Sequence, residues 1–404
     1  MILISIAYKF KTLLRIIKIY SPLWPVRRVV FRKKRKLRIS IHNYWNLKSV
    51  TTFNGSNEEV AHPLQISSVI LYFQKYVSRN QNIMQSDSEF LYSKSLKDLG
   101  INTHTIEPSF NHENKYLNDY ISGKVRNETN PPLLFLDGNT FDFLSNEEHL
   151  QISLLRNNGY IIIVDHPDLL VTKKARNILV KMLETVDFAI IHNPHIEIPE
   201  NLSNKVFLWP AFPIPNMSNL RKMEDRKSGV LFSGGMHRGH RSVFCSYLRM
   251  KGIEVADQLY LTIDNKRIDD RFLNIQSSKF DKKLHKSFLQ YENYFDLLGQ
   301  YNMAFTNGYR NSKESLLAFR VCELMANKTL VFYENKSWID HFFNPYEHYI
   351  PVENAPDLVD KIRYFTKNPG ELTRITNSAY QVMDEKYSSR LFWKELSKLV
   401  YLNH

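Results

Sequence analysis

The sequence contains very little cysteine. Only Cys245 and Cys322 occur among its 404 residues, and neither belongs to a CxxC pair or has a histidine at metal-ligand spacing. Both lie in apolar stretches. This pattern argues against a disulfide-stapled fold and against a cysteine-ligated metal site. We expect two reduced thiols buried in cores, as in a cytosolic protein.

Acidic residues are absent from the first 57 positions, which carry 13 lysines and arginines before the first acid at Glu58. The whole chain has 54 basic and 41 acidic residues, so the remainder holds 41 of each and is neutral. A nucleic-acid groove needs basic residues along the folded domains. The net charge of +13 therefore does not indicate a nucleic-acid partner.

No apolar run reaches the length of a membrane-spanning helix, roughly 18 to 20 residues. Residues 1–20 are apolar but are interrupted by Lys9, Lys11, Arg15 and Lys18, and a basic run at 32–36 follows Trp24. An amphipathic helix with a tryptophan and a polybasic stretch suits an anionic membrane surface. We expect residues 1–36 to bind the inner face of the cell membrane peripherally. A solvated basic arm with an ordinary packing helix and a cleaved targeting peptide are the alternatives.

The length and an apolar content of 43% suit two domains with separate cores. The expected fold class is α/β, with two Rossmann-like domains facing across a cleft. We divide the chain into the basic segment 1–36, a first domain 37–215, a second domain 216–385 and a C-terminal helix 386–404 that packs back on the first domain. The proline-rich stretch 206–219 is predicted to connect the domains.

In the first domain, short runs rich in Ile, Val and Leu at 37–43, 133–139, 160–168 and 187–193 alternate with helical patterns at 147–158 and 173–186. These patterns predict a parallel sheet. Each run ends near a residue type that can transfer protons, namely His42, Asp137, Asp165 with His166, and His192. Ligands bind at the carboxyl ends of such strands. We therefore expect a general base here, Asp165 or His166 ahead of His42 and Asp137, although any single one suits a turn role as well.

The second domain opens with a strand at 229–232 and a turn containing Gly234 and Gly235. Two glycines after a strand let the backbone approach a ligand, and the helix that follows offers amide donors to an anion. Arg238 and Arg241 make this turn electropositive, as candidates for phosphate contact or as ordinary surface charges. The pattern is neither GxGxxG nor GxxxxGK[ST], so no dinucleotide or P-loop site is indicated.

A later unit has a strand at 302–305, a polar loop that includes Asn307, a helix at about 314–326 and a strand at 329–332. Arg320 and Glu323 lie three residues apart, which places them on one face of that helix. Taken alone, the two charges suit an intrahelical ion pair, worth about 0.3 to 0.5 kcal/mol.

This unit resembles the donor-binding stretch of the GT-B glycosyltransferases, in which an R-x-x-E helix, a small-residue turn and an apolar strand recur. It is similar to the group 1, spore-protein-like and exostosin-type members, over roughly residues 229 to 396. The resemblance implies transfer of a sugar from a nucleotide-sugar donor. It implies that Glu323 binds hydroxyls and that Arg320 contacts or orients the diphosphate, with Gly234, Gly235, Arg238, Arg241 and Asn307 also at the donor.

Two features depart from the family pattern. The retaining branch has two glutamates with seven residues between them, whereas Glu314 and Glu323 have eight, so the stereochemical outcome stays open. The usual glycine after the helix is replaced by Asn327 or Lys328, and asparagine tolerates the left-handed backbone conformation. No DxD follows a strand, so we expect no metal and no other cofactor, with guanidinium and amide donors stabilising the leaving diphosphate.

The expected function is therefore a metal-independent glycosyltransferase that acts on a lipid-linked, lipopolysaccharide or capsule glycan acceptor at the cytoplasmic membrane face. A fucosyltransferase-like inverting enzyme with a GDP-sugar is an alternative. A non-catalytic, membrane-associated scaffold of the same fold is another.

Overall fold

The structure is a computed structural model of the whole chain. It describes residues 66, 68–72, 76–77, 83–84, 87–106, 132–138, 141, 146–166, 173–194, 196, 198–215, 220–233, 241–258, 291–306, 319–334 and 338–402. The basic segment 1–36 and the strand expected at 37–43 lie outside these residues.

The first domain is built on six parallel strands in the order β4-β1-β5-β6-β7-β8. The strands are β1 (Ser68–Tyr72), β4 (Asn102–Ile106), β5 (Leu133–Asp137), β6 (Ile161–His166), β7 (Phe188–Ile191) and β8 (Val206–Leu208). The helices are α3 (Asp87–Asp98), α6 (Asn146–Asn157) and α7 (Lys173–Thr185), and β2 (Tyr76–Val77) pairs antiparallel with β3 (Ile83–Met84). The runs predicted at 133–139, 160–168 and 187–193 are confirmed as neighbouring parallel strands, and β6 is buried along its whole length.

The second domain has five parallel strands in the order β10-β9-β11-β12-β13. They are β9 (Lys227–Ser233), β10 (Val255–Gln258), β11 (Tyr301–Thr306), β12 (Leu330–Glu334) and β13 (Ile350–Val352). The helices are α8 (Arg241–Met250), α11 (Tyr291–Leu298), α12 (Arg320–Ala326), α13 (Ala355–Lys367) and α14 (Pro369–Tyr387). The strands predicted at 229–232, 302–305 and 329–332 correspond to β9, β11 and β12.

Two stretches of chain cross between the domains, and they touch each other at a parallel bridge between Ile214 and Ser388. The first crossing is shorter than predicted, because residues 206–208 at its start form β8 and pair with β7. The prolines at 210, 213 and 215 all follow β8, where a missing backbone N–H no longer breaks a ladder. The connection therefore begins at Trp209.

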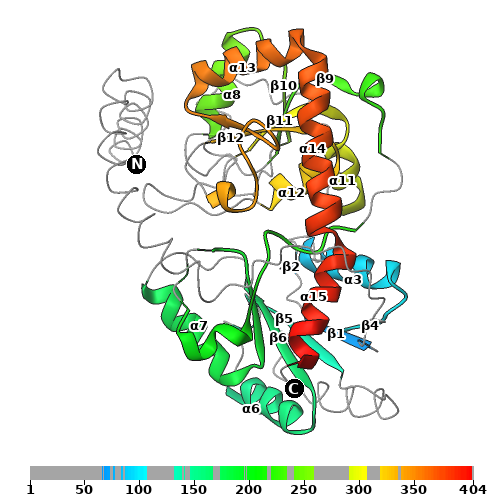
Figure 1. Cartoon of the computed structure of the whole chain (residues 1–404), viewed down its shortest axis with the longest axis vertical. Coiled ribbons are helices and arrows are strands. Elements are labelled where there is room, and N and C mark those ends of the chain that lie inside the picture. Colours follow the sequence, from blue (N-terminus) through cyan, green and yellow to red (C-terminus); the bar gives the residue numbers. More distant parts are fainter. Residues whose placement is uncertain are drawn as a thin grey trace.

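The second crossing joins α14 to α15 (Ser389–Leu402), which lies against the first domain although its sequence follows the second (Figure 1). Phe392, Trp393, Leu396 and Val400 are fully buried in a core that they share with the first sheet. The indole N–H of Trp393 donates to Ser95 Oγ on α3 at 3.0 Å. Burial of these side chains fastens the C-terminus to the first domain.

Both predicted core thiols are buried, and neither forms a disulfide. Among the described helices, none is long and apolar enough to cross a membrane.

Candidate functional site

The carboxyl ends of the two sheets meet at the boundary between the domains. His192 directly follows β7 of the first sheet, and Phe319 lies between β11 and α12 of the second domain. Their rings are in edge contact, with centroids 4.6 Å apart. Because ligands of parallel α/β domains bind at these strand ends, the boundary is the place to look for a site.

Helix α12 carries the predicted pair of charges. Arg320 is its first residue and is half-buried, whereas Glu323 in its first turn is only 6% exposed. A buried carboxylate needs compensating donors, which an ordinary surface ion pair does not. Burial, and next the carboxylate of Glu323, raises the pKa of the adjacent Cys322 thiol. Burial therefore distinguishes Glu323 from a residue of an exposed intrahelical ion pair.

The C-terminal end of α12 is fixed by a buried arginine. Arg226 donates from Nη1 to the carbonyl oxygen of Lys328 at 2.9 Å, and from Nε and Nη2 to the carbonyl oxygen of Arg221. Burial, and then the charge of Arg221, lowers the pKa of Arg226. A guanidinium on a carbonyl at a helix C-terminus also complements the helix dipole.

The turn after α12 places the left-handed residue at Lys328, with φ of +52°, whereas Asn327 has φ of −92°. Asn327 instead donates from its backbone N–H and its side-chain Nδ2 to the carbonyl oxygen of Glu323. Lysine thus takes the left-handed position of this turn, which glycine adopts without strain. Its ammonium lies over the ring of Tyr380, 4.6 Å from the centroid.

On the first domain, Asp165 is engaged on both carboxylate oxygens. The hydroxyl of Tyr92 donates to Oδ2 at 2.6 Å, and His192 Nε2 lies 2.7 Å from Oδ1. Asp165 is 1% exposed. A general base must reach the proton that it removes, so this geometry argues against Asp165 as the base and favours a positioning role.

His166 ends β6 and lies beside Gly138, which follows the neighbouring strand β5. A Cβ built on Gly138 would meet His166 Cγ at 2.6 Å and its Cα at 2.8 Å. The histidine is 5% exposed. Glycine at 138 therefore lets the His166 ring occupy the carboxyl edge of the sheet, and His166 stays the leading candidate for the acceptor base.

For the other predicted site residues, the structure gives at most their position in a helix or strand. Asp137 is the last residue of β5, in register with Asp165, and Arg241 is the first residue of α8. Asp137 thus lies at the carboxyl end of a strand, and Arg241 lies at the N-terminus of the helix that follows β9. Outside the described residues lie His42, Gly234, Gly235, Arg238 and Asn307.

Comparisons with known proteins agree with this architecture. Residues 262–397 match the family model described as glycosyl transferase-like. A search of curated proteins gives no significant match. Three similar solved structures are a glycosyltransferase from Rickettsia africae ESF-5, HepE from Anabaena in complex with UDP and glucose, and sucrose-phosphate synthase from Thermosynechococcus elongatus.

The structural similarity covers nearly all of each of those chains. The Rickettsia protein has a TM-score of 0.51 at 13% identity, covering 84% of this chain and 100% of that one. HepE has a TM-score of 0.52 at 7% identity, covering 83% of this chain and 99% of that one. Sucrose-phosphate synthase has a TM-score of 0.53 at 10% identity, covering 83% of this chain and 98% of that one. At such identities the match concerns the fold. The chain has the GT-B fold of these structures, and its residues 262–397 match the glycosyl transferase-like family model.

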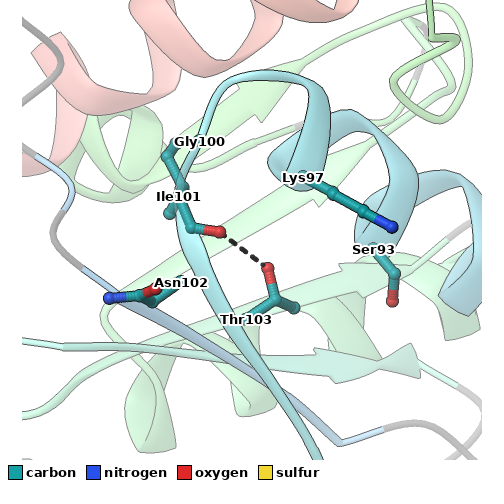
Figure 2. Close-up of a pocket in the computed structure, with 6 residues that line it drawn as sticks. All are labelled: Ser93, Lys97, Gly100, Ile101, Asn102 and Thr103. Atoms are coloured by element: carbon teal, nitrogen blue, oxygen red, sulfur yellow. Dashed lines mark hydrogen bonds between the residues drawn. The ribbon is translucent and has the colours of Figure 1, made fainter.

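A cavity of about 450 Å³ lies away from the boundary. It is lined by residues of α3, the following turn and the start of β4, among them Lys97 and Thr103 (Figure 2). Asn102, which also lines it, pairs with Ser68 at the first position of β1. The cavity therefore lies at the amino edge of the parallel sheet, opposite the strand ends that carry His166 and His192.

Within the described part of the chain, no group of three or more His, Cys, Asp or Glu side chains could hold a metal ion. Three residues at the junction were not predicted as functional from the sequence: Tyr92, Phe319 and Glu334. Glu334 ends β12 and is 4% exposed, so the strand-end rule applied to the first domain would have found it. Tyr92 and Phe319 follow no such rule, because only the tertiary structure brings them to the junction.

Proposed function

We propose that this protein transfers a sugar from a nucleotide-sugar donor, without a metal ion, to a glycan or lipid-linked acceptor of the lipopolysaccharide or capsule type. The observation that carries the proposal is the buried Glu323 on α12, at the carboxyl edge of the second sheet, with Arg320 one turn before it. The related fold of HepE, a protein that holds UDP and glucose, supports a nucleotide-sugar donor.

The two side chains suit the two halves of such a donor. A carboxylate accepts hydrogen bonds from paired hydroxyls of ribose or sugar, and a guanidinium binds phosphate oxygens in a bidentate manner. Negative charge accumulates on the diphosphate as the glycosidic bond breaks. A fixed guanidinium stabilises that charge without further reorganisation, and Arg238 and Arg241 would add to it. A metal ion is then unnecessary.

The acceptor would be activated from the first domain. His166 at the end of β6 would take the proton of the acceptor hydroxyl, while Asp165 is committed to Tyr92 and His192. An acceptor anchored in the bilayer would also give the basic segment 1–36 a purpose, because it would hold the enzyme at the cytoplasmic membrane face.

Thermal unfolding in the presence of UDP, GDP, CMP and their sugars, each with and without EDTA, tests the donor. A ligand at about 100 times its dissociation constant adds roughly 2.7 kcal/mol to the folded state. We expect one nucleotide class to raise the melting temperature equally with and without EDTA. A shift that EDTA abolishes contradicts metal independence, and no shift with any nucleotide contradicts the transferase site.

Substitution separates an enzyme from a scaffold. Arg320→Met and Glu323→Gln should each lower donor turnover by about tenfold or more, since each removes a charge-assisted hydrogen bond. Unchanged turnover would exclude Arg320 and Glu323 from the donor site, and no turnover by the wild type with any donor would favour the scaffold.

The membrane component has its own test. Sedimentation with vesicles of an anionic and a neutral lipid compares the full chain with a chain lacking residues 1–36. We expect the full chain alone to bind, and to bind only the anionic vesicles. Equal sedimentation of the two chains would remove the membrane proposal without affecting the donor site.

A further inference from the structure

A chain of buried hydrogen bonds runs from α3 through β6 to the end of β7. It consists of the Tyr92 hydroxyl, the Asp165 carboxylate, the His192 ring and the carbonyl oxygen of Trp209, which lies 2.7 Å from His192 Nδ1. Tyr92, Asp165 and His192 are each at most 4% exposed. The chain is therefore shielded from solvent.

The partners fix where the protons are. Because the carbonyl oxygen of Trp209 only accepts, His192 Nδ1 must carry a proton and donate it. A single proton then lies between His192 Nε2 and Asp165 Oδ1. The pair is neutral overall whichever atom holds that proton, which limits the cost of burying it. Both nitrogens of the ring are held, so the ring cannot rotate.

The held ring faces the donor domain. Phe319 packs edge-on against His192 and also against Phe212 of the crossing segment, with 4.6 Å between ring centroids in each case. The carbonyl oxygen of Phe319 accepts from the backbone N–H of Cys322 at 2.9 Å and of Glu323 at 3.3 Å. Phe319 is therefore the start of the first turn of α12, and any displacement of it is passed to Glu323.

We propose that His192, fixed by Asp165 and Tyr92, is a positioning residue that holds α12 through Phe319 at the orientation needed for donor binding. The inference rests on the donor site proposed above. The strand ends of the first domain would then serve donor binding as well as acceptor activation. Binding energy at the donor depends on placing Arg320 and Glu323 within a fraction of an ångström, so a loosened Phe319 lowers affinity.

Two mild variants test the contact without leaving a buried charge unpaired. Tyr92→Phe removes one hydrogen bond and keeps the ring, and Phe319→Leu removes the ring contact and keeps an apolar side chain. Ser95→Ala is the matched control on the same helix α3, because it removes the buried hydrogen bonds of Ser95 Oγ with Trp393 and with the carbonyl oxygen of Tyr92 but leaves the Tyr92 hydroxyl on Asp165.

Hydrogen exchange of the ligand-free full chain is the first readout. Tyr92→Phe and Phe319→Leu should speed exchange of the amides of α12, whereas Ser95→Ala should not. The second readout is the dissociation constant of the nucleotide that stabilises the wild type best. We expect the first two variants to weaken it by about threefold to tenfold and Ser95→Ala to leave it unchanged. The double variant should show less than the product of the single effects.

Unchanged exchange in α12 for Tyr92→Phe and Phe319→Leu would overturn the proposal. So would equal responses of all three variants, since those report a general loss of stability. If α12 responds but the wild type binds no nucleotide, the contact stands and the proposed donor function falls.

Discussion

Gly138 shows how one residue can fix the position of a candidate base. A Cβ at this position would collide with both the ring and the backbone of His166, so the neighbour cannot give way by a rotamer change alone. The absence of a side chain at 138 is thus a requirement of the His166 position.

We expect Gly138→Ala to destabilise the fold by about 1 to 3 kcal/mol through overpacking. We expect it also to lower kcat by about tenfold or more, because His166 moves from the strand end. Gly370→Ala is the control, since nothing lies within 4 Å of a Cβ there and the residue is inside α14. Chemical denaturation and steady-state kinetics measure both quantities. A Gly138→Ala enzyme with normal kcat would exclude His166 from the chemistry.

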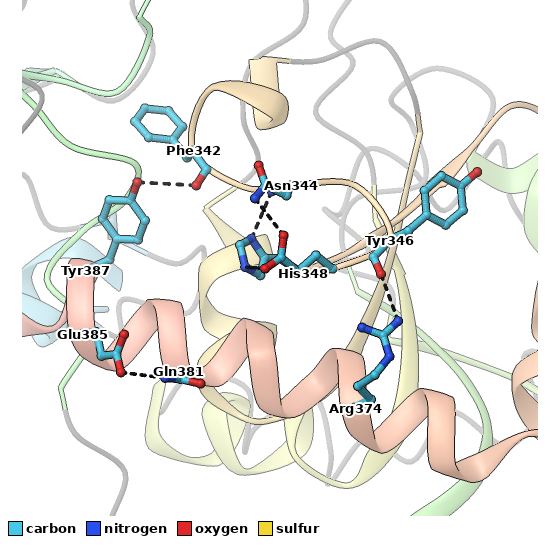
Figure 3. Close-up of polar contacts among 9 residues, drawn as sticks. Phe342, Asn344, Tyr346, His348, Arg374, Gln381, Glu385 and Tyr387 are labelled. Carbon is cyan, nitrogen blue, oxygen red and sulfur yellow. Dashed lines mark hydrogen bonds and ion pairs between the residues drawn. The ribbon is translucent and has the colours of Figure 1, made fainter. Parts of the chain in front are cut away.

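His348 is a second single residue whose surroundings make a testable prediction, here for the pH dependence of stability. His348 Nδ1 accepts from the backbone N–H of Asn344 at 3.0 Å (Figure 3), so this nitrogen is unprotonated in the fold. Burial lowers the pKa of His348 below its usual 6.5, while Glu347 raises it and Lys386 lowers it further. The neutral ring is favoured, so His348 contributes stability above about pH 6.5 that is lost as the pH falls toward the folded-state pKa.

The change His348→Asn keeps an acceptor near the Asn344 amide and removes the titration. We expect the wild type to lose more unfolding free energy than this variant between about pH 7.5 and 5.5, by no more than about 1.4 kcal/mol per pH unit. Urea unfolding at a series of pH values gives the difference. Parallel pH profiles would contradict the buried, neutral histidine.

At the scale of residues, the sequence predicted candidate site residues but not their burial or hydrogen-bond partners. The sequence predicted Asp165 and His166 together because both end an apolar strand. A sequence pattern does not show which of the two side chains is fully engaged by hydrogen-bond partners. Asp165 is engaged by hydrogen bonds with Tyr92, which lies 73 residues away, and with His192. Burial of Glu323 likewise depends on the packing of the second domain around α12.

At the scale of elements, α12 is a short helix held at both ends by residues distant in sequence. Arg226 binds the carbonyl oxygen of Lys328 at one end, and His192 and Phe212 enclose Phe319 at the other. Helical propensity alone would not hold seven residues in this conformation. The orientation of the two charges is therefore a property of tertiary contacts.

The turn after α12 offers a direct test. Lysine at a positive φ is strained by about 1 kcal/mol relative to glycine, and its contact with Tyr380 offsets part of that. Lys328→Gly and Lys328→Ala both lose the contact, but only glycine relieves the strain. We expect the glycine variant to be more stable than the alanine variant by about 1 kcal/mol in urea unfolding. Equal stability would mean that residue 328 is not left-handed in solution.

Strands were predicted well where they are buried on both faces and less well elsewhere. The runs that became β5, β6, β7, β9, β11 and β12 each contain an apolar stretch, and these six were found. Residues 206–208 were assigned to the connection because three prolines follow, although they form the edge strand β8. Strand β4 was not predicted because four of its five residues are polar, and the short apolar strand β1 was missed.

At the scale of the whole molecule, the C-terminal helix α15 follows the second domain in sequence but packs on the first domain. The core beneath the first sheet is completed by α15 from the far end of the chain, and the two crossing segments touch at Ile214 and Ser388. A periodic pattern shows that residues 389–402 form an amphipathic helix, but it does not show what that helix covers. The arrangement of the domains thus depends on contacts between residues nearly 300 positions apart.

The central claim is that α12 binds the donor through Glu323. Calorimetric titration of the nucleotide sugar that stabilises the protein best, with wild type, Glu323→Gln and the exposed control Glu371→Gln, tests it most directly. Glu371 pairs with Arg374 on α14, so its loss leaves the donor site intact. We predict that Glu323→Gln weakens binding by about tenfold or more and that Glu371→Gln binds like the wild type. Equal affinity in all three proteins would contradict the account.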